Sequence, residues 1–190
     1  SKKKSNKKTK LSKEQIINQA IQFHSQGNIS EAAKLYQYFI NQGFNDHRVF
    51  SNYGVILKDH GNLKEAEIST RKAIRLKPDF TNAHLSLGAI LRDLGNLKEA
   101  ELSTRKAIKT KPDYAEAHYN LGNILRDLDN LQEAELSYRK AIEIKPDYAD
   151  AHLNLGNIFR DLGNLQDAEL STRKAIELNP DCITAAWNLY

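Results

Sequence analysis

The chain has 190 residues, a formal net charge of +4 and a single cysteine, Cys182. A lone cysteine excludes a disulfide-stapled secreted domain and fits a reducing compartment, and no apolar run approaches the length needed to span a membrane. Seven of the 28 basic residues lie among the first thirteen positions, so the remainder is mildly acidic. We therefore expect a cytoplasmic protein without a membrane span.

The chain begins with a block of lysines, and residues 1–12 are predicted to be a disordered tail. Ser1–Lys10 contains neither apolar nor acidic residues, and like charges without apolar partners do not form a core. Lysine clusters attract phosphates, but no aromatic residue or helical spacing indicates a specific nucleic-acid site, so a solubilising tail and a functional arm both remain open. Order is expected to begin near Ser12, which has the capping-box spacing to Gln15.

After the tail the sequence repeats itself with a period of 34 residues. Glycine and proline mark the period most clearly, at Gly54, Gly88, Gly122 and Gly156 and at Pro78, Pro112, Pro146 and Pro180. A fixed period of this length is typical of a solenoid, in which one supersecondary unit stacks on the next. The predicted array has a degenerate first repeat, four clear repeats and the start of another, over residues 13–46, 47–80, 81–114, 115–148, 149–182 and 183–190.

Repeat 115–148 shows the structure that is predicted for each unit. A first helix is expected over about Glu116–Leu128, because apolar residues recur on one of its faces. A second helix is expected over about Leu131–Ile144, and Pro146 would end it because proline disfavours helical geometry in the preceding residue. Each repeat is thus predicted to be an antiparallel pair of helices.

Polar residues of this repeat have structural interpretations. Asn130, with Glu133 three residues later, is expected to cap the second helix, and an asparagine recurs at this position in every repeat. Asp129 stands where other turns have a glycine in the left-handed conformation. Glu135 and Arg139 have the favourable order and spacing for an ion pair on a solvated helix face. These columns explain the stack without a ligand.

Seven positions of the repeat resemble the signature of tetratricopeptide repeats. They are Ala117, Leu121, Gly122, Ala134, Tyr138, Ala141 and Pro146. The resemblance extends over residues 13–190 and implies an all-α fold, a right-handed superhelical solenoid of antiparallel helix pairs. It also implies that the first helices line a concave groove for an extended peptide or a partner helix, and that the repeats mediate protein–protein contacts without chemistry of their own.

Asparagines recur on the side of the first helices that is expected to line this groove. The predicted peptide-binding asparagines are Asn52, Asn120, Asn123, Asn154, Asn157 and Asn188. An amide donates and accepts hydrogen bonds at once, so it pairs with any peptide unit. The column resembles the asparagine ladder of O-linked N-acetylglucosamine transferases, whose repeats grip the backbone of an extended peptide.

Cationic and aromatic residues complete the predicted peptide site. The cations are Lys58, Arg92, Arg126 and Arg160, and the aromatic platforms are Tyr119 and Trp187. Arginines would add a preference for acidic peptides through bidentate hydrogen bonds. An aspartate follows each cation in the sequence, so the alternative is that these charges neutralise one another between adjacent repeats.

Neither a metal site nor a catalytic site is predicted. His84, His118 and His152 recur on successive first helices, but such helices are about 10 Å apart and zinc needs its ligands within about 2.1 Å of the metal, so a packing role is expected. The sequence shows no phosphate-binding loop or nucleophile–base dyad, and therefore predicts neither a cofactor nor an enzyme. The lysine of a chaperone-binding carboxylate clamp is missing from the Tyr119 column.

Three functions remain open from the sequence alone. The leading one is an interaction scaffold that binds an extended peptide. The second is the substrate-recruiting N-terminal part of a larger transferase, because such arrays often precede catalytic domains and the last repeat is incomplete. The third is self-assembly through an uncovered C-terminal helix that carries Trp187, Leu189 and Tyr190.

Overall fold

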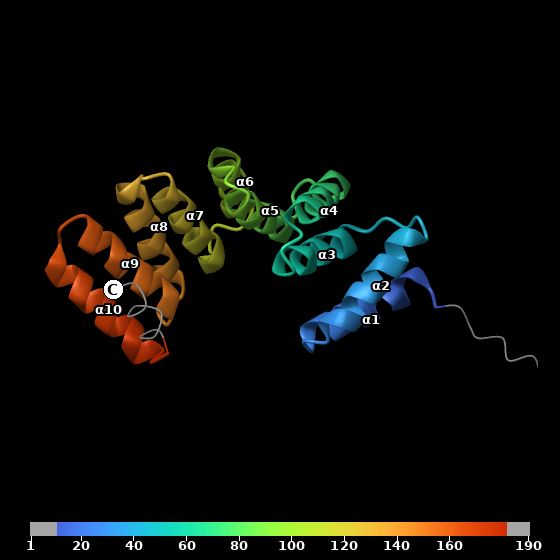
Figure 1. The fold of residues 1–190 in the computed structure, drawn as a ribbon, viewed down its shortest axis with the longest axis horizontal. Helices are drawn as coiled ribbons and strands as arrows, with labels where there is room; N and C mark the ends of the chain where they lie inside the picture. The colour runs from blue at the N-terminus through green and yellow to red at the C-terminus, as the bar shows by residue number, and fades with distance from the viewer. Residues whose placement is uncertain (1–10, 182–190) are drawn as a thin grey trace, which may run out of the picture. The chain divides into compact units, whose positions relative to one another are not determined.

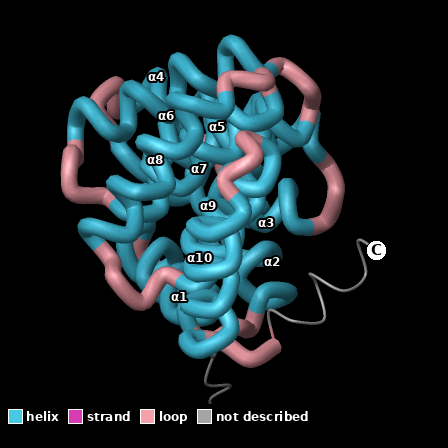
Figure 2. The backbone as a smooth tube through the Cα atoms, turned by 90° about the vertical axis from the view of Figure 1, so that its left-hand side faces the viewer, coloured by secondary structure: helices cyan, strands magenta, loops and turns pink. Residues whose placement is uncertain are grey.

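The computed structural model describes residues 11–181, and within this range all regular structure is helical, as Figure 2 shows. The predicted all-α class is therefore confirmed. None of the helices in these residues is both long and apolar enough to cross a bilayer. The predicted lysine-rich tail up to residue 10 lies outside the described residues, as do Trp187 and Asn188 of the predicted site.

The chain divides into two compact units between Pro78 and Asp79. Unit 1 contains α1 (Lys13–Ser25), α2 (Ile29–Asn41), α3 (His47–Asp59) and α4 (Leu63–Leu76). Unit 2 contains α5 (Thr81–Asp93), α6 (Leu97–Thr110), α7 (Ala115–Asp127), α8 (Leu131–Ile144), α9 (Ala149–Asp161) and α10 (Leu165–Leu178). Each odd-numbered helix packs against the helix that follows it, so that the helices form pairs (Figure 1).

The turns inside the repeats hold one residue in the left-handed region. Glycine takes this conformation with φ of 76° to 80° at Gly27, Gly61, Gly95 and Gly163. Asp129 takes it in the turn between α7 and α8, with φ of 61°, as predicted from its place in the glycine column. At the other end of α8 the backbone becomes extended at Lys145, before proline, so the helix ends at Ile144 as predicted.

The helix starts follow the predicted capping only in part. Ser12 and Gln15 form a complete capping box, with the Gln15 N–H donating to Ser12 Oγ at 3.2 Å. Asn130 and Asn164 accept from the backbone N–H three residues later, at 3.4 and 3.3 Å. The prediction is wrong for the three earlier asparagines, Asn28, Asn62 and Asn96, which make no such bond. Their backbone ψ is 60° to 62°, whereas ψ is 73° and 77° at the two asparagines that form the bond.

The paired helices approach each other most closely at the repeated glycine. A Cβ atom added to Gly54, Gly88 or Gly156 would fall within 2.6 Å of a threonine Oγ1 on the second helix. At Gly122 the added atom would instead meet the ring of Tyr138, at 2.6 Å from Cε1. The glycine therefore permits a close approach of the paired helices. The residue opposite it is fully buried at Thr70, Thr104 and Tyr138, whereas Thr172 is half-buried.

The residue opposite the glycine decides the polarity of the core. Thr70 and Thr104 are fully buried there, and their hydroxyls have no hydrogen-bond partner among the described residues. Tyr138 is equally buried, but its longer side chain carries the hydroxyl across the helix pair to Asn123. Tyrosine at this position thus replaces an unpaired buried hydroxyl, which is costly, by a paired one.

The recurrent histidines pack against the linker that precedes each first helix. Nε2 of His118 lies 2.8 Å from the carbonyl oxygen of Pro112, and Nε2 of His152 lies 3.0 Å from that of Pro146. In this geometry a protonated Nε2 donates to the carbonyl, and the bond ties the linker to the helix. The expected packing role of the column is therefore confirmed at these two residues.

Arg48 on α3 holds the first two repeats of unit 1 together. Its guanidinium donates to Asp46, which caps α3, and to both carboxylate oxygens of Glu14 on α1, at 2.9 to 3.0 Å. Burial by itself would raise the pKa of Asp46, but the hydrogen bonds from Arg48 outweigh it and lower that pKa. A hydrogen bond from the same guanidinium lowers the pKa of Glu14.

We expect this cluster to make unit 1 sensitive to acid. Both carboxyl pKa values are lower in the folded chain, so the stabilisation is fully present above about pH 4.5, where the unfolded carboxyls are ionised, and is lost as the pH falls through the folded values. Arg48→Gln removes the partner. The melting temperature of the wild type should therefore exceed that of the variant near neutral pH, and the gap should close in strong acid. A gap that is independent of pH contradicts the prediction.

Candidate functional site

Most of the predicted site residues that the structure describes lie on α7 and α9, the first helices of two consecutive repeats in unit 2. We define the first-helix face by Tyr119, Asn120 and Arg126 on α7 and by Asn154 and Asn157 on α9. All five side chains are half-buried. A polar side chain in this setting is held by its neighbours and still reaches solvent, which is what binding requires.

Asn123 is not part of this face, and the prediction that it faces the groove is wrong. Its side chain is only 6% exposed. Its Oδ1 accepts hydrogen bonds from the hydroxyl of Tyr138 at 2.8 Å and from Nδ2 of Asn154 at 2.9 Å. The tyrosine hydroxyl supplies a donor inside the helix pair, and this donor draws the asparagine inward.

Asn154 connects α9 to α7. Besides its bond to Asn123, its Nδ2 donates to the hydroxyl of Tyr119 at 3.2 Å, and its Oδ1 accepts from Nη1 of Arg126 at 3.5 Å. Both ends of the Asn154 amide are therefore engaged within the protein. This residue fixes the spacing of the first-helix face instead of offering an open amide.

Tyr119 of the first-helix face packs with two further tyrosines. The ring centroid of Tyr119 lies 5.9 Å from that of Tyr138 and 4.9 Å from that of Tyr148. Burial raises the pKa of Tyr138. Burial and, next, the neighbouring Tyr119 raise the pKa of Tyr148. The hydroxyls of Tyr138 and Tyr148 therefore stay protonated at neutral pH, and that of Tyr138 donates to Asn123.

Sequence reasoning missed Tyr148, which lies in the linker between α8 and α9. A signal was present, because an aromatic residue follows each of three consecutive prolines by two positions, as Phe80, Tyr114 and Tyr148. The period shows that the linker residue packs regularly. It does not show that the linker ring reaches the side chain of Tyr119, which depends on how α7 and α9 pack.

The predicted cationic column is paired with aspartates. Arg92 on α5 donates through Nε to Asp127 on α7, at 2.5 Å, so the alternative of neutralisation between adjacent repeats is confirmed for this pair. The other cations lie close to the aspartate that follows each of them, in the pairs Lys58–Asp59, Arg126–Asp127 and Arg160–Asp161, at 3.2, 3.7 and 3.9 Å. Partly exposed pairs of this kind contribute little to stability, but they reduce the positive charge that the column presents.

Unit 1 repeats the engagement of asparagine by tyrosine. Nδ2 of Asn52 on α3 donates to the hydroxyl of Tyr36 on α2, at 3.2 Å. Tyr36 occupies the position in its repeat that Tyr138 occupies three repeats later. In both places a buried tyrosine hydroxyl engages polar side chains of the first helices, so Asn52, like Asn154, has a structural bond.

Two amides of the first-helix face remain open. Neither Asn120 nor Asn157 forms a side-chain hydrogen bond with another of the described residues. Both are half-buried, so their positions are restricted by packing while their polar atoms stay unpaired. An extended backbone, which presents N–H and C=O groups, is the chemical partner that such amides satisfy.

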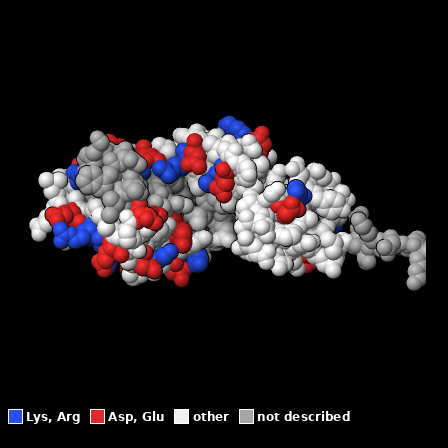
Figure 3. Space-filling model, turned by 60° about the horizontal axis from the view of Figure 1, so that its bottom comes forward, with Lys and Arg blue, Asp and Glu red and all other residues white. Residues whose placement is uncertain are grey.

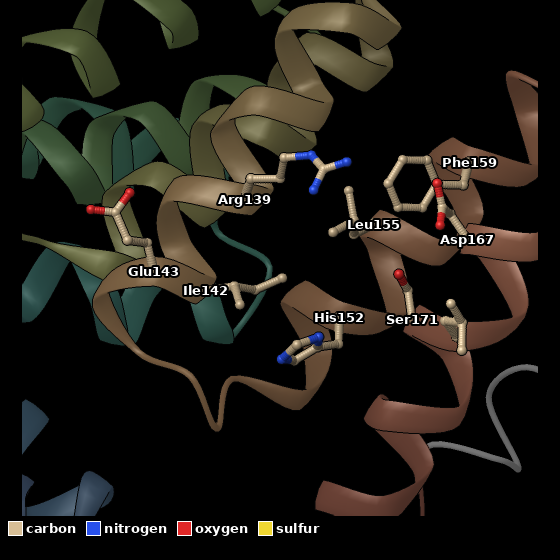
Figure 4. Close-up of a pocket in the computed structure, with 9 residues that line it drawn as sticks. Arg139, Ile142, Glu143, His152, Leu155, Phe159, Asp167 and Ser171 are labelled. Atoms are coloured by element: carbon tan, nitrogen blue, oxygen red, sulfur yellow. The ribbon is translucent and has the colours of Figure 1, made fainter. Parts of the chain in front are cut away.

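Two equivalent hollows lie in unit 2, each lined by two consecutive second helices and the first helix between them. One, of about 430 Å³, lies between α6, α7 and α8, and the other, of about 380 Å³, lies between α8, α9 and α10. Figure 4 shows the second hollow, where Arg139 of α8 faces Phe159 of α9. The guanidinium carbon lies 5.1 Å from the centre of that ring.

Charged side chains of both signs lie side by side on the part of unit 2 that is visible in Figure 3. The predicted ion pairs along the second helices of both units are all formed. They are Glu67–Arg71, Glu101–Arg105, Glu135–Arg139 and Glu169–Arg173, at 2.5 to 2.9 Å. Among residues 11–181, no group of three His, Cys, Asp or Glu side chains is placed to hold a metal ion.

Comparison with known families agrees with this arrangement of helix pairs. Models described as "Tetratricopeptide repeat" match residues 47–80 and 149–182, and a model described as "TPR repeat" matches residues 88–129 and 122–163. Together the matches include more than half of the chain. A search of curated protein sequences finds no match.

Solved structures of similar fold support the same assignment. MamA from Desulfovibrio magneticus RS-1 has a TM-score of 0.76 at 21% identity, over 89% of this chain and 96% of that chain. YrrB, described as a TPR protein with an unusual peptide-binding site, has a TM-score of 0.72 at 24% identity, over 93% of this chain and 91% of that chain. TTC0263, a thermophilic TPR protein in Thermus thermophilus, has a TM-score of 0.74 at 18% identity, over 93% of this chain and 96% of that chain. At these identities the likeness establishes the fold.

Proposed function

Because this chain belongs to the tetratricopeptide repeat family, we propose that it is a protein-interaction scaffold whose first-helix face in unit 2 binds an extended peptide. The observation that carries the proposal is the pair of open amides, Asn120 on α7 and Asn157 on α9. The same pair of helices carries the ring of Tyr119, which is packed against Tyr148. The description of YrrB, a protein of the same fold, as one with a peptide-binding site also supports it.

The face is suited to recognising a backbone more than a sequence. Each open amide offers one donor group and one acceptor to a peptide unit, and the ring of Tyr119 adds an apolar surface on α7. Tyr138, Tyr148 and Asn154 hold this ring in place before any peptide arrives. Binding to a preformed surface limits the entropy that is lost on the receptor side.

We expect the variant Asn120→Ala with Asn157→Ala to bind peptides about tenfold more weakly or worse, because each lost hydrogen bond contributes about 1 kcal/mol. The probe is the tightest peptide selected on the wild-type chain from a random phage-displayed library, and the measurement is isothermal titration calorimetry. The melting temperature should not change, because neither amide is bonded within the described residues. Equal affinities of variant and wild type would rule out the proposed contacts.

Asn154→Ala is the matched control for this test. It removes an asparagine from the same column, but one that is bonded to Asn123, Tyr119 and Arg126. It should therefore lower the melting temperature as well as the peptide affinity. A loss of affinity without a loss of stability at Asn154 would mean that this amide contacts the peptide directly, and that the contacts are not limited to the two open amides.

A further inference from the structure

Exposed leucines recur on the second helices of unit 2. Leu102 on α6, Leu136 on α8 and Leu170 on α10 occupy one position in three consecutive repeats, and they are 69%, 64% and 57% exposed. We define the second-helix face as the surface of α6, α8 and α10 that carries these three leucines. Single exposed leucines are ordinary, but a regular row of them beside open hollows is typical of an interaction surface.

Two of the three leucines line the hollows described above. Leu136 lines the hollow between α6 and α8, together with Ile108 and Leu121. Leu170 lines the hollow between α8 and α10, together with Ile142 and Leu155. Each hollow therefore has an apolar floor and an exposed leucine, so the face has both projections and recesses at the spacing of the repeats.

The net charge of the second helices changes sign along the row. Helix α6 carries four basic and two acidic residues, whereas α8 and α10 each carry two basic and three acidic residues. The change arises where Lys98 is replaced by Gln132 and Gln166, and where Lys109 is replaced by Glu143 and Glu177. The charged residues that line the hollows change in the same direction, from mainly basic to mainly acidic. They are Arg105, Lys109, Lys140 and Glu133 in the first hollow and Arg139, Glu143 and Asp167 in the second.

We propose that the second-helix face binds a second copy of this chain in a two-fold symmetric dimer. A two-fold axis that runs parallel to α8, over the exposed side of that helix, places Leu136 against its own copy and Leu102 opposite Leu170 of the second copy. The same operation places the cationic hollow over the anionic one, and Lys109 opposite Glu177. A surface that binds itself must be complementary to its own rotated image, and the opposite net charges of α6 and α10 meet this condition at the two outer helices.

The charge pattern favours a second copy over an unrelated partner of one sign. A partner segment with only acidic residues would be attracted to the hollow next to α6 and repelled at α10. A partner segment with only basic residues would be attracted at α10 and repelled next to α6. A second copy in reversed order supplies both signs where they are needed. The inference does not depend on peptide binding, because it uses α6, α8 and α10, whereas the first-helix face lies on α7 and α9.

Sedimentation velocity of the full chain over a wide range of concentrations tests the proposal. The wild type should show a concentration-dependent dimer, and Leu136→Glu should raise the dimer Kd about 100-fold or more, because each dimer loses two buried leucines. Leu136 is exposed, so the variant should keep its melting temperature. Tyr38→Glu, which adds the same charge at an exposed aromatic residue of α2 in unit 1, should leave the dimer intact.

A charge exchange tests the order of the helices in the dimer. Lys109→Glu and Glu177→Lys should each weaken the dimer about tenfold or more, since each places like charges opposite each other twice. The variant with both substitutions should recover the affinity of the wild type. A wild type that stays monomeric overturns the proposal and leaves the face to another partner. A dimer that is insensitive to Leu136→Glu, or a double variant without recovery, overturns it equally.

Discussion

Replacing Tyr138 by alanine should lower the free energy of unfolding of the chain by about 3 to 5 kcal/mol, the range for truncating a large buried aromatic residue. Tyr138 is fully buried between α7 and α8 and contacts both Gly122 and Tyr119. The truncation leaves a cavity and also removes the hydroxyl that binds Asn123. Urea denaturation followed by circular dichroism measures the loss.

Tyr138→Phe separates the ring from the hydroxyl. It keeps the packing and removes one hydrogen bond, and the Asn123 acceptor retains its bond from Asn154, so the expected cost is only about 1 kcal/mol. The phenylalanine variant should also show whether the hydroxyl positions Asn123. If alanine and phenylalanine cost the same, the ring contributes nothing by packing and the prediction fails.

Replacing Gly122 by alanine should cost about 1 to 3 kcal/mol, the range for overpacking a core, although alanine is the better helix former by about 1 kcal/mol. The added Cβ would lie 2.6, 2.8 and 2.9 Å from three ring atoms of Tyr138. A fully buried ring between two helices has no room to move aside. Thermal and urea unfolding of the single variant measure the effect.

The same substitution in the Tyr138→Ala background provides the control. Without the ring, most of the clash at Gly122 is relieved, so the added cost should be much smaller than in the wild type. The two effects should therefore be strongly non-additive, as expected for residues in direct contact. Additive effects of Gly122→Ala and Tyr138→Ala would mean that the strain at the glycine comes from the backbone of α8 and not from the tyrosine.

Helix positions were predictable from the sequence because their signals are local. The predicted first helix over Glu116–Leu128 differs by one residue at each end from α7, and the predicted second helix over Leu131–Ile144 has the bounds of α8. Proline, the left-handed turn residue and the spacing of apolar side chains act within a few residues of where they stand. The ion pairs along the second helices were predictable for the same reason.

The composition of the first-helix face was not predictable to the same degree. Repetition places an asparagine on one helix after another, and the columns look alike in the sequence. In the structure Asn123 is buried, Asn154 is bonded at both ends and Asn120 is open. The difference arises from Tyr138 on α8, which acts through a contact between helices that no spacing along one helix describes.

The sequence alone thus determined that this protein is a stack of helix pairs of the tetratricopeptide repeat family, because a period of 34 residues and local turn signals suffice for that. Only the tertiary structure decided which of the repeated residues are available to a partner. Availability depends on what a side chain meets across a helix interface. For Asn123 that is the hydroxyl of Tyr138, and for Leu136 it is open solvent beside a hollow.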